Sequence, residues 1–266
     1  MIEPAPPTRS DGDSPIRGSR SPVWSRITAS WHGVNVLVTG ASLIVQTWLV
    51  LVGSTDVNSG ASTAASPLST RLVNLFSYFT IQSNILVLIA AIRLLIDPSL
   101  SAGPTARRRT GWQVVRLTGL LGIFVTGVVY VIVLRPLSHP TGIYAAVNAG
   151  LHYVTPLLAV LGWLLLGPRP RIGWRVFWSA LIWPIAWLVY TMIRGAITGW
   201  YPYPFLEVPT IGVGATARNL AVITIMAILV LLIMKAADRL PSLGGSGRRS
   251  VDADSVESIE PPGESR

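Results

Sequence analysis

Six long apolar stretches constrain the fold of this chain more than any other feature. Each has about the 20 residues that a helix needs to cross a ~30 Å hydrocarbon core. They cover residues 32–53, 70–95, 113–134, 142–166, 174–197 and 216–236. Of the 266 residues, 50% are hydrophobic and 12% are charged, whereas soluble domains have about 25% charged residues. The sequence therefore predicts an all-α fold, a polytopic membrane bundle of six transmembrane helices.

The distribution of basic residues predicts the orientation of this bundle. Arginines cluster before the first stretch, between the second and third, between the fourth and fifth, and after the sixth. The other segment ends carry only Arg71, Arg135, Arg194 and Arg218. Because cytoplasmic loops carry the excess of Lys and Arg, both termini are expected in the cytoplasm of a multi-pass protein of the cell membrane. Heavy use of arginine over lysine favours a bacterial inner membrane.

The formal net charge of +9 fits membrane topology better than nucleic-acid binding. The basic runs lie at segment ends, where they act as topology signals and contact anionic lipids. We therefore expect membrane lipids as partners and no nucleic acid; the pattern says nothing of an oligomer. Cysteine is absent, which excludes disulfides and thiol catalysis.

Composition divides the chain into three parts. Residues 1–25 are rich in Pro, Ser, Arg and Asp and predict a disordered cytoplasmic leader, and residues 241–266 predict a disordered cytoplasmic tail. Residues 26–240 form the predicted transmembrane domain. Its connection 54–69 is expected to be a flexible loop. The aromatic and proline-rich connection 198–215 is expected at the outer mouth of the bundle, because aromatic rings favour the membrane interface.

Three predicted spans carry a stripe of polar or aromatic side chains on one helix face. These stripes are Ser77, Thr80 and Asn84 in the second span; Tyr144, Asn148, His152 and Thr155 in the fourth; and Trp183, Trp187, Tyr190 and Arg194 in the fifth. At 1.5 Å per residue, Thr80 and His152 both lie roughly 13–15 Å below the outer boundary. The second and fourth stripes are therefore predicted to face each other around a polar cavity.

His152 is the candidate of most interest, since an ionisable group at bilayer depth marks a functional site by default. The other histidines, His32 and His139, fall at the ends of stretches. A hydroxyl beside an imidazole is the pairing that activates an oxygen nucleophile, so Thr80 and His152 are the predicted catalytic pair. No carboxylate lies at their depth, which excludes a Ser–His–Asp triad.

Further residues are predicted to bind or orient a substrate. Asn84 or Asn148 would orient the imidazole or donate to an oxyanion, and Arg194 would hold a carboxylate at the mouth. Ser77 and Tyr190 complete this group. The predicted cavity offers too few His, Cys or acidic groups for a metal site, so no metal is expected. A retinal-type cofactor would need a lysine for its Schiff base, and the only lysine, Lys235, lies at a span end. No cofactor is therefore expected.

Structural explanations stand beside these functional ones. Ser, Thr and Asn side chains commonly join membrane helices, at about 0.6 kcal/mol per bond. His152 could equally make a structural hydrogen bond, and Arg194 could extend to the interface. The Trp183 and Trp187 pair is also typical of packing. A transporter, or a lipid-binding membrane protein without catalysis, is therefore the alternative to an enzyme.

Three motifs resemble the androgen-induced membrane protein family. Phe76-Ser77-Tyr78-Phe79-Thr80-Ile81-Gln82-Ser83-Asn84 resembles its tyrosine–threonine segment, and Asn148-Ala149-Gly150-Leu151-His152-Tyr153-Val154-Thr155-Pro156 resembles its histidine helix. Trp200-Tyr201-Pro202-Tyr203-Pro204 resembles its outer tyrosine–proline turn. The resemblance covers residues 32–236. It implies a multi-pass threonine hydrolase of fatty acid esters of hydroxy fatty acids, with Thr80 matching the nucleophile and His152 the essential histidine, and a small lipid-like ester as substrate.

Overall fold

The computed structural model describes residues 22–54, 62–97, 100, 110–167 and 172–240. This part of the chain is helical and contains no β-strand. Six of its helical segments are long and apolar enough to cross a membrane. They are Val23–Leu51, Phe79–Ile96, Thr110–Leu137, Gly142–Leu166, Trp174–Thr198 and Val208–Ala237. The prediction of an all-helical, multi-pass membrane protein is confirmed at this level.

The spans are built from helical elements of several kinds. The α-helices are α1 (Pro22–Leu51), α2 (Leu68–Ser77), α3 (Phe79–Ile96), α5 (Thr110–Val129), α6 (Gly142–Ala149), α7 (Thr155–Leu161), α8 (Trp174–Thr198) and α9 (Val208–Ala237). The π-helical turns are η2 (Tyr130–Leu134), η4 (Gly150–Val154) and η5 (Gly162–Leu166), and the 3₁₀ turns are η3 (Arg135–Leu137) and η6 (Pro204–Leu206). The fourth span is thus α6, η4, α7 and η5 in series.

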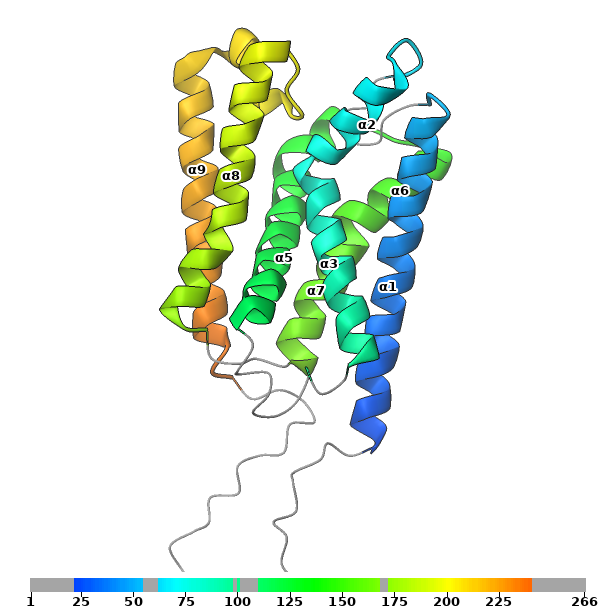
Figure 1. Ribbon diagram of the computed structural model, residues 1–266, viewed down its shortest axis with the longest axis vertical. Helices are drawn as coiled ribbons and strands as arrows, with labels where there is room; N and C mark the ends of the chain where they lie inside the picture. The colour runs from blue at the N-terminus through cyan, green and yellow to red at the C-terminus, as the bar shows by residue number, and fades with distance from the viewer. Residues whose placement is uncertain (1–21, 55–61, 98–99, 101–109, 168–171, 241–266) are drawn as a thin grey trace, which may run out of the picture.

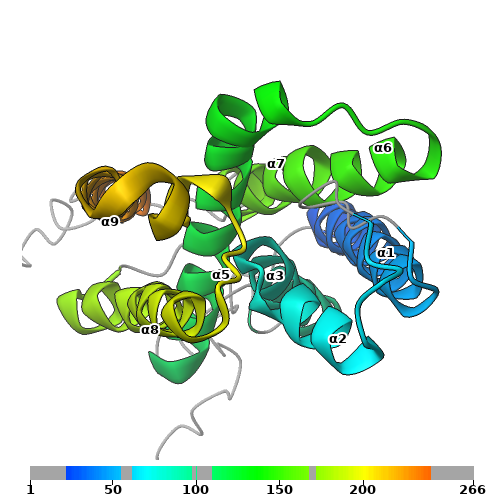
Figure 2. The ribbon, with the colours of Figure 1, turned by 90° about the horizontal axis from the view of Figure 1, so that it is seen from above.

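Both ends of the described chain lie at the same end of the bundle, which we name the terminal end (Figure 1). The opposite end, the loop end, carries α2 and the connection between α8 and α9. Seen from above, α5 lies between two groups of helices (Figure 2). α1, α3, α6 and α7 lie on one side, and α8 and α9 lie on the other.

Small residues bring α3 close to α5. A Cβ atom on Gly119 would lie 3.3 Å from the Leu86 Cβ, and one on Gly122 would lie 2.7 Å from the Ser83 Oγ. In membranes, where no hydrophobic force drives helices together, small residues allow the close backbone approach that yields packing energy. This contact holds the first turns of α3 against the centre of the bundle.

Several predicted boundaries were wrong. α1 begins at Pro22 rather than near residue 32, since proline suits the first turn of a helix; residues 22–25, predicted to be disordered, are therefore helical. α9 begins at Val208 rather than 216, because Gly212 (φ 80°, ψ 159°) allows a kink there. α2 begins inside the predicted loop 54–69, of which residues 55–61 lie outside the described residues. The rest of the leader (1–21) and the tail (241–266) also lie outside them.

The longer α1 exposes a feature that the sequence reading missed. One face of this helix carries buried polar residues, namely Thr28, His32, Asn35, Thr39, Ser42 and Gln46. His32, expected at the end of a span, is therefore an interior residue. The opposite face bears exposed apolar side chains such as Leu37 and Ile44. This arrangement, polar inside and apolar outside, suits a helix whose outer face meets lipid.

Candidate functional site

The second span is broken near the loop end of the bundle, where a continuous helix was predicted over 70–95. α2 ends at Ser77 and α3 begins at Phe79, while Tyr78 between them is extended (φ −69°, ψ 130°). Ser77 therefore does not share a helix face with Thr80 and Asn84, and that prediction was wrong. Neither Pro nor Gly occurs between Leu75 and Gln82, so the break has no sequence signal of the usual kind.

Side chains bind the backbone groups that the break leaves without helical partners. The Gln82 Nε2 donates to the Phe76 carbonyl (2.8 Å), and the Trp187 Nε1 donates to the Ser77 carbonyl (2.9 Å). The Thr80 N–H donates to the Tyr203 hydroxyl (3.2 Å). An unsatisfied backbone group in a membrane costs several kcal/mol, so these contacts make the broken span possible.

The break places Thr80 in the first turn of a helix at depth in the bundle. Thr80 is the second residue of α3 and is 2% exposed. The N-terminus of an α-helix carries a partial positive charge of about +0.5. Negative charge that develops on or near the Thr80 hydroxyl is therefore stabilised there.

Thr80 and His152 are in contact, as the matching depths of their spans predicted. The Thr80 Oγ1 lies 3.4 Å from the His152 Nε2. The other ring nitrogen, Nδ1, lies 3.2 Å from the Asn148 carbonyl oxygen. A carbonyl only accepts, so Nδ1 carries the proton in the neutral ring and Nε2 presents its lone pair to Thr80. Their catalytic roles remain a prediction.

The π-helical turn η4 and Tyr130 hold the imidazole in place. His152 belongs to η4, and π-turns are frequent at functional sites because they shift side chains out of the regular helical positions. The Tyr130 ring stacks on the imidazole with a centroid distance of 4.1 Å. Tyr130 was not predicted as a site residue; its position near the C-terminal end of the third stretch was the available signal.

Both predicted asparagines connect segments of the site. The Asn84 Nδ2 donates to the carbonyls of Thr80 (2.8 Å) and Leu151 (3.2 Å), so both of its amide hydrogens are used and neither is left for an oxyanion. The Asn148 Nδ2 donates to the Tyr130 hydroxyl (2.6 Å). Asn148 orients the imidazole through its backbone carbonyl rather than its side chain.

The four polar residues of the fourth span do not all face the second, because η4 interrupts the helical repeat. Tyr144 bonds Ser54, Asn148 bonds Tyr130, His152 contacts Thr80, and Thr155 bonds Thr39. The prediction of one stripe facing another thus holds for His152 and is wrong for the other three.

The stripe on the fifth span does face the second span. Trp183, Trp187 and Tyr190 bond the side chain of Gln82, the backbone of Ser77 and the side chain of Ser77, respectively. Arg194 donates to the Asn74 Oδ1 (2.6 Å) and lies over the Trp200 ring. Its Nη1 is buried and has no hydrogen-bond partner among the described residues. Ser77, Tyr190 and Arg194 thus hold α2 against α8.

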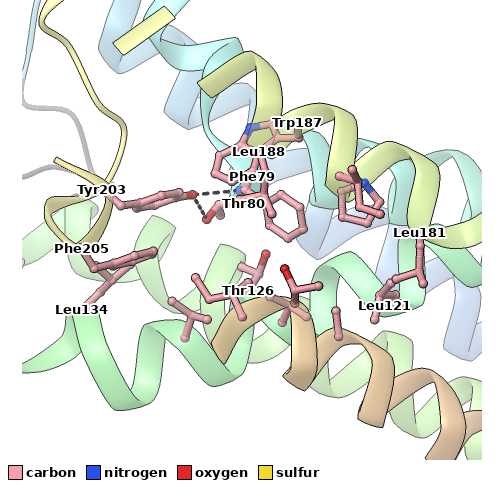
Figure 3. A pocket seen from close by; sticks show the side chains of 17 residues that line it. Phe79, Thr80, Leu121, Thr126, Leu134, Leu181, Trp187, Leu188, Tyr203 and Phe205 are labelled. Atoms are coloured by element: carbon pink, nitrogen blue, oxygen red, sulfur yellow. Dashed lines mark hydrogen bonds between the residues drawn. The ribbon is translucent and has the colours of Figure 1, made fainter. Parts of the chain in front are cut away.

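Tyr203 is a second site residue, besides Tyr130, that the sequence did not predict. Its hydroxyl lies 3.2 Å from both the N and the Oγ1 of Thr80 (Figure 3). The side chain is 5% exposed, although it belongs to the connection expected at the outer mouth. The Tyr-Pro-Tyr-Pro run was the available signal, but a run of aromatics does not say which ring points inward.

A cavity opens beside Thr80, between α3, α5, α8, α9 and the connection that carries Tyr203 (Figure 3). Its empty space amounts to about 700 Å³, a figure that includes space open to the surroundings. Thr80, Thr126, Tyr203 and Thr224 supply hydroxyls, and the lining is otherwise apolar or aromatic. The predicted cavity was polar, and that was wrong: apolar and aromatic side chains form most of the lining.

The imidazole does not border the cavity. Thr80 lines the cavity, whereas His152 is 2% exposed and is not among the lining residues. A ligand in the cavity would therefore meet Thr80 and not His152. The described residues contain no group of three or more His, Cys, Asp or Glu that could hold a metal ion. No protein-family model, curated protein or solved structure matches this chain.

Proposed function

We propose that this protein is an integral membrane hydrolase of lipid-like esters, with Thr80 as nucleophile and His152 as general base. The observation that carries the proposal is the Thr80–His152 contact, in which the Asn148 carbonyl fixes the proton on Nδ1 and leaves Nε2 facing the hydroxyl. The resemblance of the Thr80 and His152 motifs to the androgen-induced family supports it.

The reaction follows from this geometry. The Thr80 Oγ1 attacks the ester carbonyl carbon while its proton moves to the His152 Nε2. The ester C–O bond then breaks, and the leaving alkoxide takes that proton. Water, activated by the same nitrogen, hydrolyses the acyl-threonine and releases a fatty acid. The 3.4 Å separation is long for a resting bond, and such bonds tighten when substrate binds.

The cavity supports a lipid-like substrate. Its largely apolar lining suits an acyl chain, with the carbonyl at the Thr80 hydroxyl. The free Nη1 of Arg194 is proposed to bind a substrate carboxylate at the loop end, and Ser77 and Tyr190 to support that end of the site.

The orientation is part of the proposal. The positive-inside distribution favours cytoplasmic termini, which puts the terminal end in the cytoplasm and the loop end, with Thr80, in the outer half of a bacterial inner membrane. Substrate is proposed to enter the cavity from the surrounding lipid.

Activity-based labelling tests the proposal. Purified protein in detergent should label covalently with an alkyl fluorophosphonate at Thr80, as peptide mapping would show. Thr80→Ala and His152→Ala should abolish labelling. Thr118→Ala, a buried threonine outside the cavity, and His139→Ala, an exposed histidine, serve as matched controls and should label normally. Labelling that persists in Thr80→Ala would refute the mechanism.

The apolar cavity itself favours a second candidate, a lipid-binding protein without catalysis. In that case, a photoreactive fatty acid ester should crosslink to cavity residues of the wild-type protein and of Thr80→Ala alike. The wild-type protein should then release no free fatty acid and take up no fluorophosphonate. The two assays on the same preparations separate the candidates.

A further inference from the structure

We propose that Tyr203 is a third catalytic residue, whose hydroxyl donates a hydrogen bond to the oxyanion that forms when Thr80 attacks an ester. This inference rests on the proposed hydrolase function. Its basis is the position of the phenol, 3.2 Å from the nucleophilic Oγ1 and at the edge of the cavity that would hold the ester (Figure 3).

The Tyr203 hydroxyl makes two contacts with Thr80, and it takes a different role in each. The Thr80 N–H can only donate, so the Tyr203 oxygen accepts at that contact. The Tyr203 O–H can then donate at its second contact with this residue, where the acceptor is the Thr80 Oγ1. The Thr80 O–H in turn donates to the His152 Nε2. The bonds thus form a chain with one direction, which ends at the Asn148 carbonyl.

Attack on the ester changes the acceptor of the phenol. As the Oγ1–C bond forms, the carbonyl π pair moves onto the carbonyl oxygen and the Thr80 proton moves to the His152 Nε2. The negative oxygen is attached to the same carbon as Oγ1, within reach of the Tyr203 O–H. When the pair returns, the leaving-group C–O bond breaks and His152 protonates the alkoxide. Tyr203 keeps its own proton throughout and is a donor, not an acid.

The amide and indole donors near Thr80 are engaged elsewhere. Both amide hydrogens of Asn84 go to backbone carbonyls. The Trp187 Nε1 donates to the Ser77 carbonyl, and the Asn148 amide donates to Tyr130. Tyr203 therefore supplies the side-chain hydroxyl that both contacts the nucleophile and borders the cavity. The positive end of α3 adds to its effect.

The phenol is held rigidly, as an oxyanion donor must be. Its ring stacks on Phe205 (centroid distance 5.3 Å) and packs edge-on against Tyr78 (5.7 Å). Pro202 and Pro204 on either side restrict the backbone of the connection. A donor already in place when charge develops needs little reorganisation, which is why such groups contribute strongly to catalysis.

Ester and thionoester hydrolysis test this role. The substrates are p-nitrophenyl octanoate and its analogue with sulfur in place of the carbonyl oxygen, and sulfur is a weak hydrogen-bond acceptor. Wild type, Tyr203→Phe and Tyr201→Phe are compared in detergent micelles. Tyr201 belongs to the same connection, but its ring packs against Gly195 and does not line the cavity. Melting temperatures in detergent show whether each variant is folded.

Tyr203→Phe should lower kcat on the ester by about 10²–10³-fold, the effect of removing one oxyanion donor, and should change the thionoester rate only a few-fold. Tyr201→Phe should match wild type on both. An equal loss on both substrates, or no loss on either, overturns the inference and leaves the hydrolase intact. If the wild-type protein hydrolyses the two substrates at equal rates, the inferred oxyanion hydrogen bond is overturned, even if Tyr203→Phe does not fold. If the wild-type protein is inactive on both substrates, the proposed hydrolase function is itself refuted.

Discussion

The polar face of α1 and the cluster around Thr80 are both buried between helices, yet they are built differently. On α1, hydroxyls bond within a regular helix, as Thr28 bonds the Trp24 carbonyl and Thr39 bonds Asn35. Around Thr80, the groups come from distant segments and the backbone is irregular, with a break at Tyr78 and a π-turn at His152.

This difference separates two uses of polar residues in a membrane bundle. A polar face on a regular helix joins helices at modest energetic gain. Irregular backbone at membrane depth is tolerated where protein covers it or where it lines a cavity. Irregular backbone also places side chains in positions that a regular helix would not allow. We therefore expect the regular face to serve helix packing, and we propose chemistry only for the irregular cluster.

The largest effect is expected on the rate of ester hydrolysis, in a comparison of the two buried histidines His152 and His32. His152→Ala should lower ester hydrolysis by about 10⁴-fold or more, because it removes one member of a catalytic unit. His32→Ala, on the polar face of α1, should leave the rate within a few-fold. Hydrolysis of p-nitrophenyl octanoate by the purified variants measures both. Similar losses of hydrolysis rate in the two variants would contradict the proposed difference between the Thr80 cluster and the polar face of α1.

A smaller effect is expected where side chains stabilise the break. Trp187→Phe removes the donor to the Ser77 carbonyl and should destabilise the protein by about 1–3 kcal/mol, the penalty for a buried group left unsatisfied. Trp178→Phe, at a 57% exposed position of the same helix, is the matched control and should change stability little. Thermal unfolding in detergent compares them, and equal melting temperatures would show that the break needs no such support.

The smallest effect is expected between α1 and α7. Thr39 and Thr155 bond through their hydroxyls at 3.0 Å. A double-mutant cycle with Thr39→Val and Thr155→Val should give a coupling energy of about 0.6 kcal/mol, the average for membrane hydrogen bonds. Ester hydrolysis by Thr39→Val should equal that of wild type. A large loss of activity in that variant would extend the catalytic cluster onto α1.

Sequence reasoning reached the central contact of the site because depth along a helix is a local property. The positions of Thr80 and His152 in their stretches, at 1.5 Å per residue, placed them at one level. A polar group at that level needs a polar partner, which supplied the pairing. Neither step required knowledge of which helices are neighbours.

The break at Tyr78 and the place of Tyr203 could not be reached in this way. Residues far along the chain stabilise the break: Trp187 bonds Ser77 across 110 positions, and Tyr203 bonds Thr80 across 123. Local propensity around Tyr78 favours a continuous helix, since no Pro or Gly interrupts it. The apolar lining of the cavity could not be predicted either, because it depends on which side chains from distant segments come together in the fold.

The sequence by itself determined that this chain forms six long apolar helices and that two of them carry a hydroxyl and an imidazole at one depth. These properties follow from hydrophobic length and helical rise, which need no neighbours. The tertiary structure alone decided that the second span breaks before Thr80, that a loop tyrosine contacts Thr80, and that an apolar cavity adjoins this residue. Each of these depends on hydrogen bonds and packing between distant segments, which a linear pattern does not contain.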